Sequence, residues 1–218
     1  RRQTRAPGQR RFVSDTAPET RLAPLVDTHC HLQSPRFDDD RDAVIARNLE
    51  ALEWCVTIGG DLDSNAAALE LVRPRLYAVL GFHPYHAAQV DDGALDALRA
   101  HRTHPQVVAI GEMGLDYFNE YAPRDVQARA FRRQLELAVE LQKPIVIHNR
   151  EADADCHAML REYAPALAGC VMHCFSSGPA EAEQFLELGF YISFAGNVTF
   201  NKAQPLRDAA QRVPLDHL

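Results

Sequence analysis

Two histidines spaced two residues apart, His29 and His31, follow the first apolar run of the chain, residues 25–28. On a β-strand, residues two apart point to the same face. We therefore expect the two imidazoles to project side by side from one strand end, with Cys30 turned the other way. Two imidazoles held in this way are half of a metal site, although a His-x-His pair also occurs at ordinary strand ends.

Four more ionisable side chains stand at the C-terminal ends of later apolar runs. Any one of the histidines could simply donate a hydrogen bond to a loop carbonyl. Because all four side chains share the same position on separate predicted strands, we interpret them together with the opening pair as one site built from several strands. These residues are His83, Glu112, His148 and His173.

The elements that must position these residues alternate regularly from Leu25 onward. Short apolar runs, several of them apolar throughout, alternate with segments of helical periodicity, which is typical of a parallel sheet with helical crossovers. The predicted strands are 25–28, 54–58, 76–80, 107–110, 145–147, 170–172 and 190–194. The predicted helices are 38–53, 61–72, 91–101, 123–141, 151–163, 179–188 and 202–212.

This alternation favours an α/β fold of the TIM-type (β/α)8 barrel class, with seven β/α units present. A doubly wound open sheet is the alternative, but it would normally carry a glycine-rich phosphate turn after an early strand. Neither GxGxxG nor GxxxxGK[ST] occurs in the sequence. In a barrel the C-terminal strand ends share one rim, so the six side chains would converge there.

The predicted donor set constrains the metal. Four histidines with one carboxylate suit Zn²⁺ or Mn²⁺, whereas a shell of oxygen atoms alone would suit Mg²⁺ or Ca²⁺ better. Five candidate ligands exceed one tetrahedral site with an open position, which indicates two divalent ions. Glu112 has two oxygens and could bridge them. A pair of such ions can generate hydroxide near neutral pH and stabilise an in-line displacement at phosphorus.

Composition sets limits on partners and location. The net charge of −7 argues against a broad basic surface for nucleic acid, but not against a nucleic-acid enzyme whose cations are bound metals. No apolar run approaches the roughly 18 residues needed to cross a bilayer, so no membrane partner is expected. The five cysteines lack a CxxC pair and are predicted to be free thiols in a reducing compartment, which predicts a cytoplasmic protein.

The organisation is predicted to be one domain with an extension. Residues 1–23 are rich in arginine and proline without sustained periodicity, which is typical of a flexible basic arm. Residues 24–218 hold the barrel units and all the candidate site residues.

Five segments resemble the TatD family of metal-dependent deoxyribonucleases, which are amidohydrolase-like TIM-barrel hydrolases. The resemblance runs from about Leu25 to the end of the chain, with the motifs in family order. The segments are VDTHCH (26–31), GFHP (81–84), GEMGLDY (111–117), PIVIHNR (144–150) and HCFSS (173–177).

The resemblance implies roles for particular residues. His83 would lie beside the scissile phosphate and act with Glu112 in catalysis. Asn149 and Arg150 could contact the phosphate, and Asp116 would support the loop behind Glu112. The implied cofactors are two divalent ions: Zn²⁺, Mn²⁺ or Mg²⁺. The implied metal ligands are His29, His31, Glu112, His148 and His173.

The activity implied is cleavage of DNA phosphodiester bonds by a metal-activated hydroxide, as an exonuclease acting on single strands or ends, by a monomer. An ester or amide hydrolase on the same barrel is an alternative, including one that removes D-amino acids from tRNA. An inactive barrel that serves as a binding module is a third interpretation, from a different functional class.

The sequence departs from the family at its C-terminal end. In the family an eighth strand ends in an aspartate, usually within Glu-Thr-Asp, that binds metal and serves as a base. Here the sequence reaches its end at residues 213–218, and Asp216 is expected to lie in a connecting loop. We therefore expect a C-terminally truncated barrel with an open seam, weakened metal occupancy and little nuclease activity.

Overall fold

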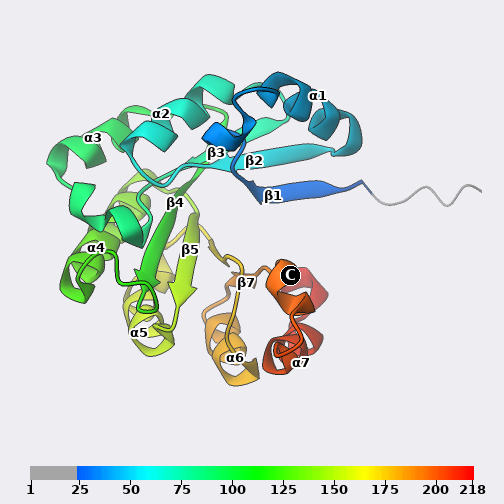
Figure 1. The fold of residues 1–218 in the computed structure, drawn as a ribbon. Helices are drawn as coiled ribbons and strands as arrows, with labels where there is room; N and C mark the ends of the chain where they lie inside the picture. The colour runs from blue at the N-terminus through cyan, green and yellow to red at the C-terminus, as the bar shows by residue number, and fades with distance from the viewer. Residues whose placement is uncertain (1–23) are drawn as a thin grey trace, which may run out of the picture.

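The seven strands of the computed structural model, which describes residues 24–218, form one parallel sheet in chain order. The sheet curls into part of a barrel (Figure 1). This confirms the α/β TIM-type fold with seven strand–helix units. The strands are β1 (Val26–Cys30), β2 (Trp54–Ile58), β3 (Leu76–Leu80), β4 (Val107–Asp116), β5 (Ile145–Arg150), β6 (Cys170–Met172) and β7 (Tyr191–Ile192).

Helices lie outside the curved sheet (Figure 1). The α-helices are α1 (Arg41–Ala51), α2 (Leu62–Leu71), α3 (Asp92–Ala100), α4 (Arg124–Leu141), α5 (Asp153–Tyr163), α6 (Pro179–Glu187) and α7 (Gln204–Arg212). Short 3-10 helices fill several connections: η1 (Pro35–Phe37), η2 (Pro84–Gln89), η3 (Ala164–Ala166), η4 (Gly196–Thr199) and η5 (Leu215–His217). None of the described helices is long and apolar enough to cross a membrane.

The longest helix, α4, packs against the central strands through one apolar stripe. Phe131, Leu135 and Ala138 are all buried. They join Ile110 of β4 and Ile145 of β5 in the largest apolar cluster. Residues at i, i+4 and i+7 share one helix face, so the sequence spacing was sufficient to find this contact.

Two central strands extend further than their apolar runs. β4 was predicted to end at Ile110 but continues to Asp116, and β5 continues past Ile147 to Arg150. The extensions pair with each other, with Gly114 opposite His148. Glu112 and His148 therefore lie within strands rather than after them. Residues 111–116 of β4 are buried as well, so the glycines and carboxylates that interrupt the apolar run do not end the strand.

Smaller corrections occur at other boundaries. The helix predicted from residue 38 begins at Arg41, because Pro35–Phe37 forms a separate 3-10 turn before it. The strand predicted over 190–194 is only Tyr191–Ile192. Within residues 24–218, β1 and β7 are the edges of the sheet. The predicted basic arm, 1–23, lies outside the described residues.

Gly114 allows β4 and β5 to approach closely beside the site. Its φ is +142°, a conformation that side chains rarely adopt, and a Cβ built there would lie 1.9 Å from the carbonyl oxygen of His148. Since that neighbour is backbone, it cannot rotate away. The pairing of these two strands therefore requires glycine at this position.

We expect Gly114→Ala to lower the free energy of unfolding by more than about 2 kcal/mol, because it adds both backbone strain and a clash with a strand. Urea denaturation followed by circular dichroism measures the effect. Gly93→Ala is the matched control, since a Cβ there meets Asp91 at an ordinary 3.5 Å. Equal stability of the two variants would contradict the close-approach argument.

Candidate metal centre

Glu112 is the centre of the candidate site. Its side chain, from β4, is buried with 6% exposed. Oε2 lies 3.2 Å from His29 Nε2, and Oε1 lies 3.1 Å from His148 Nδ1. The two oxygens of one carboxylate thus face imidazoles from β1 and β5. This is the arrangement expected of a carboxylate that bridges two ions.

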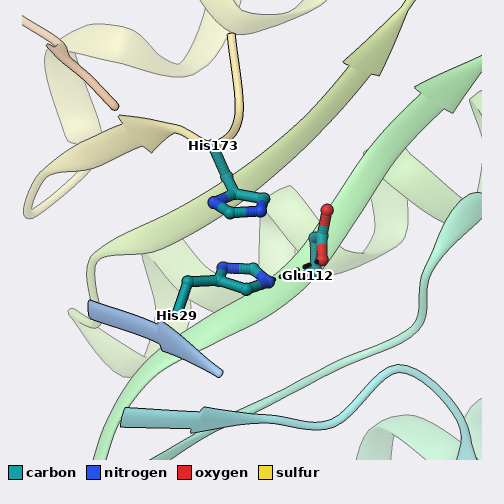
Figure 2. Close-up of side chains that lie close together, drawn as sticks. All are labelled: His29, Glu112 and His173. Atoms are coloured by element: carbon teal, nitrogen blue, oxygen red, sulfur yellow. Dashed lines mark ion pairs between the residues drawn. The ribbon is translucent and has the colours of Figure 1, made fainter. Parts of the chain in front are cut away.

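The first donor group consists of His29, Glu112 and His173. Figure 2 shows the His29 and His173 rings lying one above the other beside Glu112. Their centroids are 3.3 Å apart and their planes differ by 6°. Both ring nitrogens of His29 are buried without a hydrogen bond, since Nε2 approaches Glu112 Oε2 at 3.2 Å without hydrogen-bond geometry. Because a buried polar atom normally has a hydrogen-bond partner, these nitrogens fit a site that holds a cation.

The second donor group consists of His83, Glu112 and His148, and it shares Glu112 with the first. The His83 and His148 rings lie 4.2 Å apart. His83 Nδ1 accepts a hydrogen bond from the backbone N–H of Tyr85, at 3.3 Å. The neutral ring must then carry its proton on Nε2, which makes that atom a donor rather than a metal ligand. This tautomer supports the predicted place of His83 beside a phosphate.

His31 lies outside both donor groups. Its ring is 5.2 Å from that of His29, so the two imidazoles do project side by side as predicted. Nδ1 lies 3.0 Å from the carbonyl oxygen of Ile58. A carbonyl only accepts, so Nδ1 carries the proton and Nε2 keeps its lone pair. His31 remains a predicted ligand on the basis of that free nitrogen.

Asp116 has a role that the sequence analysis missed. It supports its loop as predicted, accepting from the backbone N–H groups of Phe118 at 3.1 Å and Asn119 at 2.7 Å. Its Oδ2 also lies 3.0 Å from His148 Nε2. A carboxylate in this position fixes the tautomer of a metal-binding imidazole. The even spacing of Glu112 and Asp116 within one strand is the signal that could have revealed it.

Burial and charge set the protonation states around Glu112. Burial lowers the pKa of His83 and of His173 to about 4, so both are neutral near pH 7. Burial alone would raise the pKa of Glu112, but its contacts with His148 and His29 hold it well below the usual range. The centre therefore holds an ionised Glu112 beside neutral His83 and His173. Burial alone would lower the pKa of His148, but Glu112 and Asp116 raise it, so binding of a divalent ion at this imidazole would displace a proton.

Buried amides of α4 hold the strand ends that carry these side chains. Gln134 accepts from the backbone N–H of Phe82 at 2.8 Å and donates to its carbonyl at 3.1 Å. Gln127 accepts from the backbone N–H of Asp116 at 2.8 Å and donates to its carbonyl oxygen at 2.9 Å. Because each amide satisfies both backbone groups, the chain beside His83 and at the end of β4 is fixed in position.

Two clefts open beside the centre, and they differ in charge. The larger, which we call the acidic cleft, has a volume of about 880 Å³ and is lined by His31, Arg36, Asp61, Asp63, His83 and Glu112 among others. The second, the basic cleft, has a volume of about 490 Å³. It is lined by His148, Arg150, His173, Asn197, Phe200 and Lys202 among others. Asn149 also lines it but is buried, with Nδ2 donating to Asp153 at 2.6 Å.

Residues 26–218 match the sequence profile of the family described as TatD related DNase. The chain belongs to the TatD family. It is similar to the uncharacterized metal-dependent hydrolase YabD of Bacillus subtilis, with 38% identity over 197 residues, or 89% of this chain and 77% of YabD. It is also 32% identical over 198 residues to the Salmonella typhimurium protein named 3'-5' ssDNA/RNA exonuclease TatD, or 89% of this chain and 76% of that protein.

Solved structures agree with this membership. The structure of YjjV, a TatD homolog from Escherichia coli K12, superposes with a TM-score of 0.81 at 31% identity, covering 89% of this chain and 76% of YjjV. A TatD family hydrolase from Entamoeba histolytica has the same fold, with a TM-score of 0.80 at 23% identity over 89% of this chain and 72% of that one. The chain is therefore a TatD-type metal-dependent hydrolase that acts on ester bonds.

We expect Asp116→Asn to lower the affinity for divalent ions about 10- to 100-fold, as is typical when an imidazole ligand loses its carboxylate partner. Zinc titration against a chromophoric chelator measures the affinity. The control is Asp125→Asn, an Asp on α4 whose side chain pairs with Arg129 at the surface. Unchanged affinity in the Asp116 variant would show that Asp116 does not orient His148.

Proposed function

We propose that this chain hydrolyses phosphodiester bonds near an end of single-stranded nucleic acid, using two divalent ions held around Glu112. The observation that carries the proposal is the buried Glu112 carboxylate with one oxygen toward each of two histidine groups. His29, His31 and His173 would hold one ion with Glu112, and His148 would contribute to the other. When bound, such ions supply a nucleophile at neutral pH and stabilise negative charge at phosphorus.

The protein's own residues would bind and orient the phosphate. His83 is neutral and presents Nε2–H, so it would donate a hydrogen bond to a non-bridging oxygen. The exposed guanidinium of Arg150 lies 4.0 Å above the ring of Phe118, which limits its orientations and leaves its N–H groups free for a phosphate. Because Asn149 is buried and bonded to Asp153, Arg150 is the better placed of the two predicted phosphate contacts.

The nucleic-acid substrate is supported by one similar protein's name. The Salmonella relative is named a 3'-5' ssDNA/RNA exonuclease, and it aligns over 89% of this chain. We extend that class of substrate to this chain because its candidate site carries a hydrogen-bond donor and a cation beside the metal centre. A D-aminoacyl-tRNA hydrolase on the same barrel would need the same metals and is tested as a separate arm below.

We expect the full-length protein that contains residues 1–218, loaded with Zn²⁺, Mn²⁺ or Mg²⁺, to shorten labelled single-stranded DNA and RNA, and EDTA to abolish the reaction. Elemental analysis of the full-length protein should find close to two ions per chain, whereas residues 1–218 alone should show weaker metal occupancy and little nuclease activity. A chain that binds metal and cleaves only D-aminoacyl-tRNA would contradict the proposed substrate. A chain that binds no divalent ion would contradict the proposed centre as well.

We expect Glu112→Gln to lower the hydrolytic rate by more than the roughly 100-fold typical of losing an outer partner of a ligand, because both ion sites lose a charged donor. Initial rates on the same labelled oligonucleotide measure the effect. Glu50→Gln is the matched control, since Glu50 is an exposed residue of α1. Similar rates in the two variants would remove Glu112 from the proposed centre.

A further inference from the structure

The basic cleft is chemically unlike the acidic cleft on the other side of Glu112. Among the described residues, no Asp or Glu side chain lines it, whereas Asp61 and Asp63 line the acidic cleft. Arg150 and Lys202 line the basic cleft, and neither forms an ion pair or a side-chain hydrogen bond with another residue of 24–218. In the described part of the chain, the acidic cleft also contains an unpaired cation, Arg36, but there it lies among carboxylates, whereas the two cations of the basic cleft have none beside them in its lining.

An exposed aromatic ring accompanies these cations. Phe200 lines the basic cleft and is 66% exposed. It lies two residues before Lys202, on the connection between η4 and α7. A lone exposed aromatic residue is ordinary on a protein surface. Phe200 shares this cleft with two cations and with two candidate metal ligands, His148 and His173. Aromatic rings on which bases stack, together with cations that contact phosphates, are the combination that binds single-stranded nucleic acid.

The segment that carries Phe200 is fixed rather than loose. Arg207 of α7 donates to the carbonyl oxygens of Val198 at 3.0 Å and Phe200 at 2.8 Å. Asn197 donates to the carbonyl of Phe175 at 3.0 Å, which ties the segment to the end of β6. Because the backbone beneath the ring is already fixed, less freedom is lost when a base stacks on Phe200 than would be lost on an unanchored loop.

We propose that the basic cleft binds the strand of a single-stranded polynucleotide next to the scissile bond, with a base stacked on Phe200 and backbone phosphates at Lys202 and Arg150. The inference rests on the proposed function and extends it to two residues, Phe200 and Lys202. The cleft leads directly to the centre, because His148 and His173 belong to its lining. A polyanion would enter from this side, since the acidic cleft repels it.

Binding of fluorescent 12-nucleotide DNA and RNA oligonucleotides, protected at both ends by phosphorothioate linkages, tests the proposal in the metal-loaded protein. We expect Phe200→Ala to weaken binding about 5-fold or more, the size of one lost base stack. Lys202→Met should reduce the slope of log affinity against log salt by about 0.7, the value for one phosphate contact on a single strand. Hydrolysis of bis(4-nitrophenyl) phosphate, which carries no further strand, should fall much less in both variants than cleavage of an unprotected oligonucleotide does.

Conservative and distant variants serve as controls. Phe200→Tyr should restore stacking and Lys202→Arg should restore the salt slope. Arg161→Met removes an exposed cation of α5 that does not line the basic cleft, and it should bind as the wild type does. Comparison of the DNA and RNA arms shows which polynucleotide is preferred.

The outcomes separate the inference from the proposed function. If the wild type binds and cleaves oligonucleotides while Phe200→Ala and Lys202→Met behave like it, the basic cleft is not the strand site. An equal loss in Arg161→Met would likewise overturn the inference, because it would indicate a diffuse charge effect. If the wild type hydrolyses the small diester but binds no oligonucleotide, the nucleic-acid substrate itself is wrong, and the inference falls with it.

Discussion

The rest of the site depends on burying one charged carboxylate, Glu112, among imidazoles. A buried carboxylate without partners would be strongly destabilising, so its surroundings must supply compensating charge or hydrogen bonds. Here His29 and His148 lie within 3.2 Å and 3.1 Å of its two oxygens. The contacts that stabilise the ionised carboxylate also place imidazole nitrogens close to it, and these nitrogens are the predicted ligands of divalent ions. Stability and chemistry therefore rest on the same set of atoms.

The fold holds this arrangement through outer contacts that are themselves buried. Asp116 faces the far nitrogen of His148, and Gln127 and Gln134 of α4 fix the backbone near it and near His83. These polar groups satisfy one another in pairs, so each is tolerated in the core. One helix thereby supports two strand ends of the site.

The two clefts beside the candidate centre differ in the charge of the residues that line them. Carboxylates face the substrate space on the α2 side, whereas Arg150 and Lys202 face it on the α7 side. Under the proposed function, a chain with a net charge of −7 attracts a polyanion because one cleft presents two cations and, among the described residues, no carboxylate. Local placement of charge, rather than the total, then governs how a substrate approaches the metals.

The sequence by itself determined the order of elements and the location of the site. The apolar runs and helical periodicity predicted seven strand–helix units. Their position at the ends of apolar runs identified four candidate residues that the structure brings together: His29, Glu112, His148 and His173. Local periodicity suffices for this because parallel sheets bury their strands on both faces and order them by right-handed crossovers. The roles of these residues as ligands remain predictions.

Only the tertiary structure decided how far strands β4 and β5 extend, which tautomer His83 adopts, and that Asp116 meets His148. It alone placed Phe200 and Lys202 in one cleft with His148 and Arg150, which lie fifty or more positions earlier in the chain. Hydrogen bonds and pocket walls of this kind join elements distant in sequence, and no local pattern encodes the distance between two side chains. The candidate site residues could therefore be identified from the sequence, whereas packing determined which of their side chains face one another.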